Sequence, residues 1–453
     1  MRLFGTDGIR GVANEAPMTP ELALRLGRAI AYVAGRGKNR KPRIVIGKDT
    51  RLSGYMLETA MASGICAMGG KVMLSGPIPT PAVAHLTVSM RADAGVVISA
   101  SHNAYQDNGI KVFGSDGFKL PDEKEMEIER LMCSSDMDTN APTGAGIGLA
   151  YRIGDARGRY IVFSKQTFPK ELTLDGLRVV VDAAHGAAYS VAPSVFAELG
   201  AEVFPIGCEP NGSNINDHVG ALHPSAAQQE VARRGADIGI ALDGDADRVI
   251  IVDDKGQTVD GDAIMALYGT AQLRAGKLAG GTVVATIMSN LGLERAITGA
   301  GGVLKRTAVG DRYVVEEMRK GGYTFGGEQS GHLIFLDHAS TGDGIVAALQ
   351  VLAIMIQSGR RLSDLVAESI HRVPQLLKNV SLIERKPIEQ MPKLQAAIRA
   401  VEKDLGSEGR VLVRWSGTEP KLRIMVEGPD ETRIAKYVDD MLSQAILDIP
   451  EKK

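Results

Sequence analysis

The chain has 453 residues, a length at which single hydrophobic cores usually split, so we expect two to four domains. Hydrophobic residues make up 44% and charged residues 23%, which is ordinary for a folded protein. The formal net charge of -2 argues against a general affinity for nucleic acid or anionic membrane, because either would normally show a basic excess. Small molecules are therefore the expected partners.

The sequence also indicates a cellular compartment. The N-terminal residues MRLFGTDGIRG contain no apolar signal core, and the longest apolar segment, IVAALQVLAIMI from Ile345, is too short to span a bilayer. Cys66, Cys133 and Cys208 are far apart and form no CxxC pair of the kind that binds zinc. We expect a cytoplasmic protein in a reducing compartment, with no membrane partner.

Three stretches share one local plan, in which a β-branched strand, a polar or glycine-bearing loop, a helix and a second strand follow one another. They span residues 43–76, 178–207 and 282–310. Their apolar runs are typical of sheets that are covered on both faces. Each stretch therefore predicts a strand–helix–strand unit of an α/β domain.

After about residue 370 the order changes to strand, helix, strand, strand, helix, which is typical of a smaller two-layer domain. The predicted fold is three α/β domains of mixed sheet and helices plus a smaller C-terminal α+β domain. The predicted domains are 1–153, 154–256, 257–370 and 371–453. The segment near residue 140 is the clearest connecting stretch.

The first loop with chemical potential lies in AGVVISASHNAYQDNGIKVFG, residues 94–114. Ser101 follows a buried strand, where open α/β sheets place their ligands. No G-x-S-x-G elbow surrounds it, and adjacent side chains of an extended chain point to opposite sides, so His102 is a poor base for Ser101. Taken alone, this loop is better explained as an ordinary loop with local hydrogen bonds.

The second loop, in IGIALDGDADRVIIVDDKG, gathers Asp243, Asp245 and Asp247 between two buried strands. Two carboxylates about 4 Å apart repel by roughly 4 kcal/mol at an effective dielectric constant of 20, so three converging ones call for a cation such as Mg2+ or Ca2+. An EF-hand is excluded because Arg248 and Asp254 stand where its glycine and glutamate belong. Three carboxylates over-neutralise a divalent ion, so Arg248 is a candidate partner for them, while the metal keeps a place for a phosphate oxygen. A solvated acidic turn is the alternative.

The third loop, TFGGEQSGHLIF, places Glu328, Ser330 and His332 on a glycine-rich turn. A carboxylate accepts hydrogen bonds from two neighbouring hydroxyls at once, which favours a sugar ligand. An ordinary polar turn explains the pattern as well. Asp343 in STGDG then stands at the N-cap of a predicted helix.

The fourth loop, RWSGTEPKLRIMVE, belongs to the C-terminal domain. Hydroxyls, glycine amides and guanidinium groups together favour a phosphate, and a capping turn with surface arginines is the alternative. The residues concerned are Arg414, Ser416, Gly417, Thr418 and Arg423. The four loops together describe an enzyme that acts on phosphosugars.

At this point the chain resembles the α-D-phosphohexomutase family over essentially its whole length. The motifs FGTDGIRG, SASHNAYQDNGIK, DGDADR, GGEQSGH and RWSGTEPKLRIM occur in the family's order. The resemblance implies four domains around a central cleft, a phosphoserine at Ser101 and a Mg2+ held by that phosphate with Asp243, Asp245 and Asp247. It further implies Lys111, Arg10 and His332 as candidates for proton transfer.

The implied reaction exchanges the 6-phosphate of a sugar for a 1-phosphate through a sugar 1,6-bisphosphate, which also primes the enzyme. Gln329 and the segments PNGSNIND and VGDRYV resemble the branch that converts glucosamine 6-phosphate to glucosamine 1-phosphate, toward UDP-N-acetylglucosamine and cell-wall precursors. Glucose or mannose phosphates are the alternative substrates. A non-catalytic protein that binds metal and phosphosugar is a further alternative, and a homodimer is an expectation from the family.

Three residues depart from the family's pattern. Ala104 stands where proline is usual, His185 replaces the usual asparagine, and Trp415 follows Arg414. None of them removes a predicted ligand, although Ala104 frees a backbone angle of the serine loop.

Overall fold

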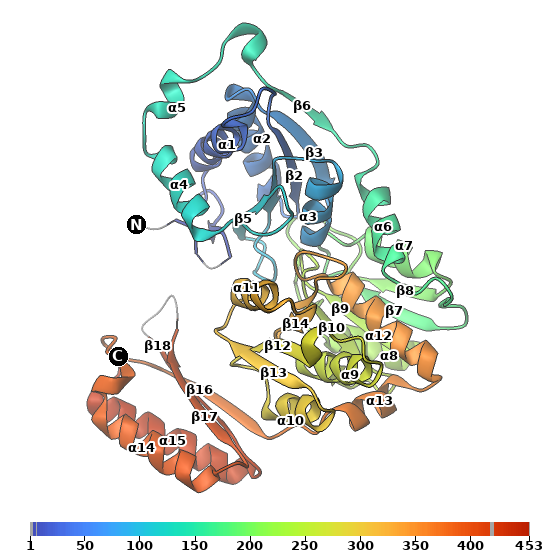
Figure 1. Cartoon of the computed structure of the whole chain (residues 1–453), viewed down its shortest axis with the longest axis vertical. Coiled ribbons are helices and arrows are strands. Elements are labelled where there is room, and N and C mark those ends of the chain that lie inside the picture. Colours follow the sequence, from blue (N-terminus) through green and yellow to red (C-terminus); the bar gives the residue numbers. More distant parts are fainter. Residues whose placement is uncertain (1–2, 6, 417–420, 453) are drawn as a thin grey trace. The chain divides into compact units, whose positions relative to one another are not determined.

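The computed structural model describes residues 3–5, 7–416 and 421–452 (Figure 1). The chain folds into two compact units. Unit 1 holds residues 1–288 and 300–369, and unit 2 holds residues 289–299 and 370–453. Unit 1 carries three sheets and unit 2 carries one, counted over the described residues.

The first sheet of unit 1 has six strands in the described part of the chain, in the order β1-β5-β4-β2-β3-β6. The bounds are β1 (Ile9–Val12), β2 (Arg43–Lys48), β3 (Lys71–Pro77), β4 (Ala94–Ile98), β5 (Asp107–Gly114) and β6 (Leu149–Arg152). Strands β4, β2, β3 and β6 run parallel, and β5 is antiparallel to both of its neighbours, β1 and β4. The sheet is therefore mixed, as predicted.

Helices pack on both faces of this sheet because β2 and β4 are apolar along almost their whole length. The helices of this region are α1 (Pro20–Gly35), α2 (Ser53–Ala67), α3 (Thr80–Ser89), α4 (Asp122–Met132) and α5 (Asp136–Thr139). Helices α1 and α2 pack against each other, and α3 packs on β2 and β4. After α5, the predicted connecting stretch passes η1 (Gly144–Gly146) and returns to the sheet as β6, which pairs with β3.

The second sheet has the order β11-β10-β9-β7-β8. Its elements are β7 (Arg178–Asp182), β8 (Glu202–Ile206), β9 (Ile238–Leu242), β10 (Val249–Val252) and β11 (Thr258–Val259), with α6 (Ala156–Gln166), α7 (Val191–Glu198) and α8 (Ser225–Arg234). Strands β7, β8 and β9 are parallel, whereas β9 and β10 form an antiparallel hairpin. The acidic loop is the turn of that hairpin.

The third sheet has the order β13-β12-β14-β15. Its elements are α9 (Gly261–Arg274), η2 (Ala279–Gly281), β12 (Thr282–Thr286), β13 (Val303–Thr307), α11 (Asp311–Gly321), β14 (Phe325–Gly327), β15 (Leu333–Phe335), α12 (Gly344–Ser358) and α13 (Leu362–Ser369). The predicted hydroxyl-binding loop is the turn between β14 and β15, which pair antiparallel.

Unit 2 contains the predicted order of strand, helix, strand, strand and helix. The elements are α10 (Leu291–Gly299), β16 (Gln375–Ser381), η3 (Ile388–Gln390), α14 (Pro392–Leu405), β17 (Arg410–Trp415), β18 (Lys421–Glu427) and α15 (Glu431–Asp448). Its antiparallel sheet has the order β16-β18-β17 and shares a core with α14 and α15. Helix α10 also belongs to this unit, where Asn290 Nδ2 donates to Val373 O at 2.9 Å.

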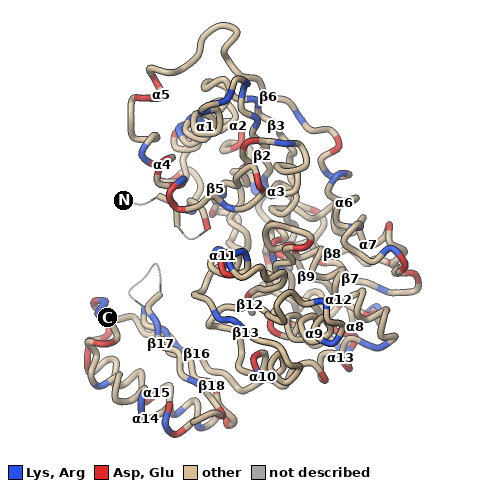
Figure 2. The backbone as a smooth tube through the Cα atoms, in the orientation of Figure 1, with Lys and Arg blue, Asp and Glu red and all other residues tan. Residues whose placement is uncertain are grey.

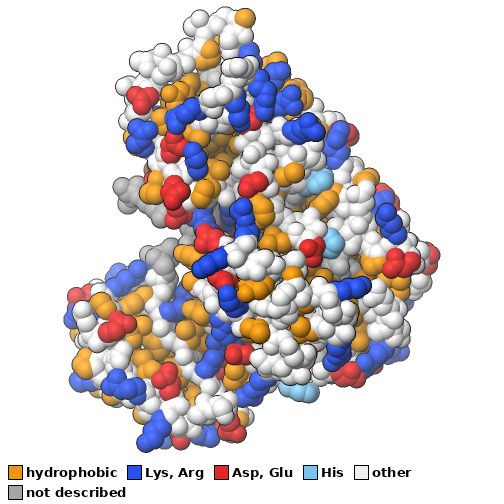
Figure 3. All heavy atoms as spheres, viewed as in Figure 1, with side chains coloured by type: hydrophobic (Ala, Val, Ile, Leu, Met, Phe, Trp, Pro, Cys, Tyr) orange, Lys and Arg blue, Asp and Glu red, His pale blue; other side chains and the backbone are white. Residues whose placement is uncertain are grey.

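Charge is mixed over both units. Positive and negative side chains are interspersed along the chain (Figure 2), and charged side chains of both signs lie among hydrophobic ones on the face shown in Figure 3. This distribution agrees with the formal net charge of -2. Among the described helices, none alone is long and apolar enough to cross a membrane, although α12 and α13, which meet at 99°, reach that length and composition together.

Helix α12 is largely buried, and Asp343 is its N-cap residue. The Asp343 carboxylate accepts hydrogen bonds from the backbone N–H groups of Ile345 and Val346, both at 3.0 Å, which confirms the predicted N-cap. The hydroxyl of Tyr160 donates to the same carboxylate at 2.8 Å. Burial nevertheless dominates and raises the pKa of Asp343 to about 6.

The raised pKa predicts how stability depends on pH. The pKa of aspartate in an unfolded chain is about 3.9, so folding favours the protonated form of Asp343. The contribution of Asp343 to the free energy of unfolding is therefore fully present below about pH 4 and is lost as the pH rises through about 6. Asp343→Asn keeps an acceptor for the cap but does not titrate. The melting temperature of the variant relative to wild type should therefore rise between about pH 4 and pH 7, by the equivalent of up to about 3 kcal/mol. A difference that stays constant with pH would contradict the burial argument.

Candidate active site

Ser101 lies in a tight loop beyond the end of β4, as the sequence predicted. Its backbone φ is 53°, in the left-handed region that costs a non-glycine residue of order 1–3 kcal/mol. Hydrogen bonds hold this conformation: Ser101 N donates to Ser99 Oγ at 2.9 Å, and Ser101 O accepts from Arg51 Nη2 at 3.0 Å. A strained and firmly held backbone is common at reactive residues.

The Ser101 side chain faces the acidic loop. Its Oγ donates to Asp243 Oδ2 at 2.6 Å, and the residue is 1% exposed. His102 Nδ1 lies 3.3 Å from the same Oγ, so the prediction that the two neighbouring side chains diverge was wrong. That prediction assumed extended chain, whereas the backbone of Ser101 is left-handed. Burial lowers the pKa of His102 to about 4, with Arg248 and Arg10 lowering it further.

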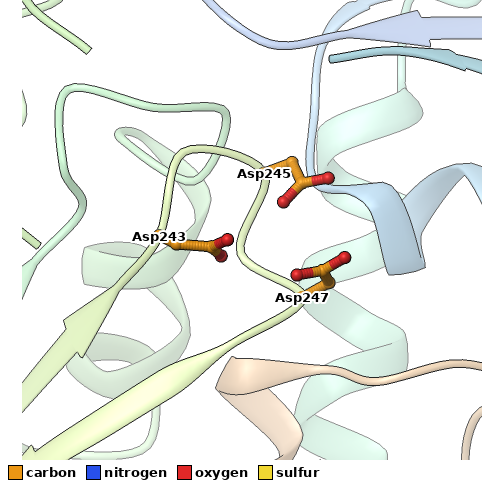
Figure 4. Close-up of side chains that lie close together, drawn as sticks. All are labelled: Asp243, Asp245 and Asp247. Carbon is orange, nitrogen blue, oxygen red and sulfur yellow. The ribbon is translucent and has the colours of Figure 1, made fainter. Parts of the chain in front are cut away.

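The three aspartates of the β9–β10 loop converge (Figure 4). One carboxylate oxygen each from Asp243, Asp245 and Asp247 lies within 4.8 Å of the others, and all three residues are buried. Burial raises the pKa of Asp243 well above its usual value, and the charges of Asp247 and Asp245 add to the rise. A solvated acidic turn is excluded by this burial.

The donor set fits a divalent cation. Oδ1 of Asp245 and Oδ1 of Asp247 are buried and have no hydrogen-bond partner among the described residues. Asp245 is oriented by Thr80, whose hydroxyl donates to Asp245 Oδ2 at 2.7 Å. Converging oxygen ligands of this kind are what Mg2+ prefers in proteins.

Lys111 extends from β5 into the same cluster. Its Nζ lies 3.1 Å from Oδ2 of Asp245 and 3.1 Å from Oδ2 of Asp247. Burial alone would lower the pKa of Lys111, but these carboxylates raise it well above its usual value. These neighbours favour the charged form of Lys111, whereas a general base needs a lowered pKa.

The acidic cluster is part of a closed ring of alternating charges. Three members of this ring, Asp7, Lys119 and Asp311, were not predicted from the sequence. Lys111 Nζ lies 3.2 Å from Asp7 Oδ2, and Lys119 bonds both Asp7 and Asp311, the latter at 2.5 Å. His332 closes the ring, with Nε2 3.5 Å from Asp311 Oδ2 and Nδ1 3.7 Å from Asp247 Oδ1. The six members are Asp7, Lys111, Lys119, Asp247, Asp311 and His332.

Two arginines offer free donors beside the cluster. Arg10 bonds Asp7, and Arg248 lies with its Nε 3.9 Å from Asp247 Oδ1. The Nε atoms of both guanidinium groups are buried without a hydrogen-bond partner in the described part of the chain. Such donors fit the oxygens of a phosphate.

The predicted hydroxyl-binding loop packs on β10, next to the acidic loop. Val249 N donates to Gly331 O at 3.1 Å, and Gly331 has a φ of 89°, which favours glycine. Glu328 Oε1 accepts from Gly310 N at 3.0 Å, while Ser330 is exposed. The structure therefore brings the first, second and third loops together in unit 1.

The fourth loop lies in unit 2, and Gly417 and Thr418 fall outside the described residues. Arg414 and Arg423 stand opposite each other on β17 and β18, and Asn379 stands opposite Arg423 on β16. Both Nε atoms are buried without a hydrogen-bond partner among the residues described. Burial and the charge of Arg423 lower the pKa of Arg414, and two opposed like charges favour an anion between them. Ser416, which is 4% exposed, follows directly on β17.

The residues that depart from the family pattern have structural partners. Ala104 O accepts a hydrogen bond from Arg51 Nη1, and His185 Nδ1 accepts from Glu209 N at 3.1 Å. Trp415 Nε1 donates to Lys386 O at 2.7 Å. None of the three touches the acidic cluster through a hydrogen bond found in the described residues.

Comparison with known proteins identifies the family. Sequence models of the phosphoglucomutase/phosphomannomutase family match the chain in order: alpha/beta/alpha domain I over residues 1–138, domain II over 159–256, domain III over 260–373 and the C-terminal domain over 377–444. Together these matches cover most of the chain.

Relatives and solved structures agree with that match. A phosphoglucosamine mutase of Sorangium cellulosum is 66% identical over 99% of this chain and 93% of its own length. One of Anaeromyxobacter sp. is 62% identical over 98% of this chain and 95% of its own length.

Two solved structures share the fold. A phosphoglucomutase/phosphomannomutase family protein of Burkholderia thailandensis has a TM-score of 0.82 at 24% identity and covers 99% of both chains. The N-acetylphosphoglucosamine mutase of Aspergillus fumigatus, in complex with GlcNAc-6P and magnesium, has a TM-score of 0.67 at 16% identity and covers 98% of this chain and 96% of its own. The chain belongs to the phosphoglucomutase/phosphomannomutase family, the α-D-phosphohexomutases.

Proposed function

We propose that this protein interconverts glucosamine 6-phosphate and glucosamine 1-phosphate, with Ser101 as the carrier of the phosphoryl group. The observation that carries the proposal is the 2.6 Å hydrogen bond from Ser101 Oγ to Asp243, at the edge of three buried carboxylates. The choice of the amino sugar rests on relatives named phosphoglucosamine mutase that are 57–66% identical to this chain.

The proposed reaction has two halves. In the first, the Oγ–P bond of phosphorylated Ser101 breaks while an O–P bond forms to the free hydroxyl of the sugar phosphate, whose proton passes to a basic group of the site. The resulting 1,6-bisphosphate turns over and returns its other phosphate to Ser101 Oγ. The sugar 1,6-bisphosphate is therefore also the primer for an unphosphorylated enzyme.

The side chains of the site align the groups and neutralise charge, which are the main requirements of phosphoryl transfer. Asp243 accepts the hydrogen bond of Ser101 Oγ, and the buried Nε atoms of Arg10 and Arg248, which have no hydrogen-bond partner among the described residues, are proposed to bind phosphoryl oxygens. A Mg2+ held by Asp243, Asp245, Asp247 and the Ser101 phosphate would supply further positive charge. Glu328 and Ser330 are proposed to bind sugar hydroxyls and His332 to take part in proton transfer. Lys111, which its carboxylate neighbours keep charged, is proposed to balance phosphoryl charge.

In unit 2 we propose that Arg414, Ser416, Gly417, Thr418 and Arg423 bind the phosphate remote from Ser101. The unpartnered guanidinium donors of Arg414 and Arg423 support this role. A cytoplasmic enzyme without a nucleic-acid or membrane partner is also part of the proposal, and a homodimer is the assembly expected from the family.

The assay that tests the function compares three substrates. Glucosamine 6-phosphate, glucose 6-phosphate and mannose 6-phosphate are incubated separately with the protein, Mg2+ and a trace of sugar bisphosphate, and formation of the 1-phosphate is followed. We expect the highest kcat/KM with glucosamine 6-phosphate and no turnover by Ser101→Ala, which lacks the carrier oxygen. Faster turnover of glucose or mannose phosphate would overturn the substrate assignment, and absence of turnover on all three would favour a binding protein.

Removing one carboxylate tests the metal site. Asp245→Asn removes a charged ligand, so Mg2+ affinity should fall by about tenfold or more and activity should fall with it. Mg2+ titration by calorimetry and by activity measures both quantities. Glu408→Gln, at an exposed acid of unit 2, is the control and should change neither. Equal effects of the two substitutions would contradict the metal assignment.

Arg423→Ala tests the phosphate site of unit 2. The substitution removes a charge-assisted contact worth roughly 1.5–3 kcal/mol, so kcat/KM should fall about tenfold to hundredfold. More added bisphosphate should be needed, because a weakly held intermediate escapes before it reorients. Arg399→Ala, at an exposed arginine of the same unit, is the matched control. Unchanged kinetics in Arg423→Ala would assign Arg423 a purely structural role.

A further inference from the structure

The conformation of the Ser101 loop depends on a second buried charge pair that lies outside the acidic cluster. Arg51 is 0% exposed and Asp49 is 1% exposed, both just beyond the end of β2. Arg51 Nε donates to Asp49 Oδ2 at 2.8 Å. A buried guanidinium is costly unless its donors are satisfied, so the other bonds of Arg51 indicate its role.

Among the described residues, the remaining side-chain bonds of Arg51 all go to carbonyls of the serine loop. Arg51 Nη2 donates to Ser101 O at 3.0 Å and to Asn103 O at 2.8 Å, and Nη1 donates to Ala104 O. One planar, rigid group therefore fixes three carbonyls of a four-residue turn. The lysine side chain ends in a compact ammonium group without the planar fork of donors, so it cannot bind these three carbonyls in the same way.

Asp49 holds the same loop through a second path. Ser99 Oγ donates to Asp49 Oδ2 at 2.5 Å and in turn accepts from Ser101 N at 2.9 Å. The two paths together restrain both the N–H and the C=O of Ser101. They account for a φ of 53° at a residue that is not glycine.

Asn216, in the loop between β8 and α8, also binds the serine loop. Asn216 Nδ2 donates to Ser101 O at 2.9 Å and to Asn103 O at 3.0 Å, which are the two carbonyls that Arg51 Nη2 also binds. The loop is thus held from both sides, which offsets the freedom that Ala104 gives it in place of proline.

We propose that Arg51, braced by Asp49, is a positioning residue that holds Ser101 in its left-handed conformation and thereby aims Oγ at Asp243. Arg51 touches neither Oγ nor the acidic cluster through any bond found in the described residues, so it acts through the backbone. The kinetic part of this inference rests on the proposed phosphoryl-transfer function, whereas the conformational part does not.

The test compares Arg51→Lys with wild type in the full-length protein. Because a displacement of about 1 Å in a reacting group costs up to about a hundredfold in rate, kcat should fall about a hundredfold while KM for the sugar phosphate stays within about twofold. Hydrogen–deuterium exchange of the peptide 99–105 should be about tenfold faster or more. A kcat within twofold of wild type, or unchanged exchange of this peptide, would overturn the proposal.

Lys48→Met is the matched control for lost stability. Lys48, at the end of β2, forms a buried ion pair at 2.6 Å with Glu58 of α2, and among the residues described its side chain makes no bond to the serine loop. This variant should lower the melting temperature without changing kcat or the exchange of peptide 99–105. Equal kinetic losses in both variants would show a general stability effect and contradict the proposal.

If Arg51→Lys does not fold, Ser99→Ala tests the proposal instead, because it removes the hydroxyl that links Asp49 to Ser101 N. It should accelerate exchange of the same peptide and lower kcat by about tenfold with unchanged KM, and wild-type values would contradict the inference. If wild type shows no mutase turnover, the proposed function fails, and the exchange measurements still decide the role of Arg51.

Discussion

The structure of the site depends on one constraint, the burial of three aspartates that approach one another within 4.8 Å. At an effective dielectric constant of about 20, each pair of charges about 4 Å apart repels by roughly 4 kcal/mol. Lys111 and His332 lie against these carboxylates, and Asp7, Lys119 and Asp311 balance them in turn. This ring connects all three sheets of unit 1, so the charges that balance the acidic cluster also hold the loops around Ser101.

Much of this arrangement is predictable because it follows strand ends. Asp243 comes directly after the buried strand β9 and Ser101 three residues after the end of the buried strand β4, and hydrophobic pattern locates such strands well. The structure confirms the three strand–helix–strand units and the mixed sheets, and it brings Ser101 Oγ onto Asp243. The catalytic and binding roles assigned to individual residues remain predictions that the proposed experiments address.

The parts that the sequence did not predict depend on contacts between distant residues or on backbone conformation. Lys119 meets Asp7 and Asp311 only after folding, and Asp7 was visible in sequence only as one letter of a family motif. The left-handed φ of Ser101 has no glycine to mark it, so the neighbouring His102 was placed on the wrong side. Helix α10 has the pattern of an α/β unit, yet it belongs to unit 2, because the loop before it bonds to that unit at Val373.

The central claim is that Ser101 carries the phosphoryl group, and a single-turnover experiment tests it most directly. Enzyme phosphorylated at Ser101 is mixed with excess glucosamine 6-phosphate, quenched at successive times, and assayed by peptide mass for phosphoserine and by chromatography for the 1,6-bisphosphate. The account predicts that phosphoserine disappears as bisphosphate appears, at a rate no slower than kcat. Product formation while the phosphate on Ser101 stays in place, or loss of that phosphate more slowly than turnover, would contradict it.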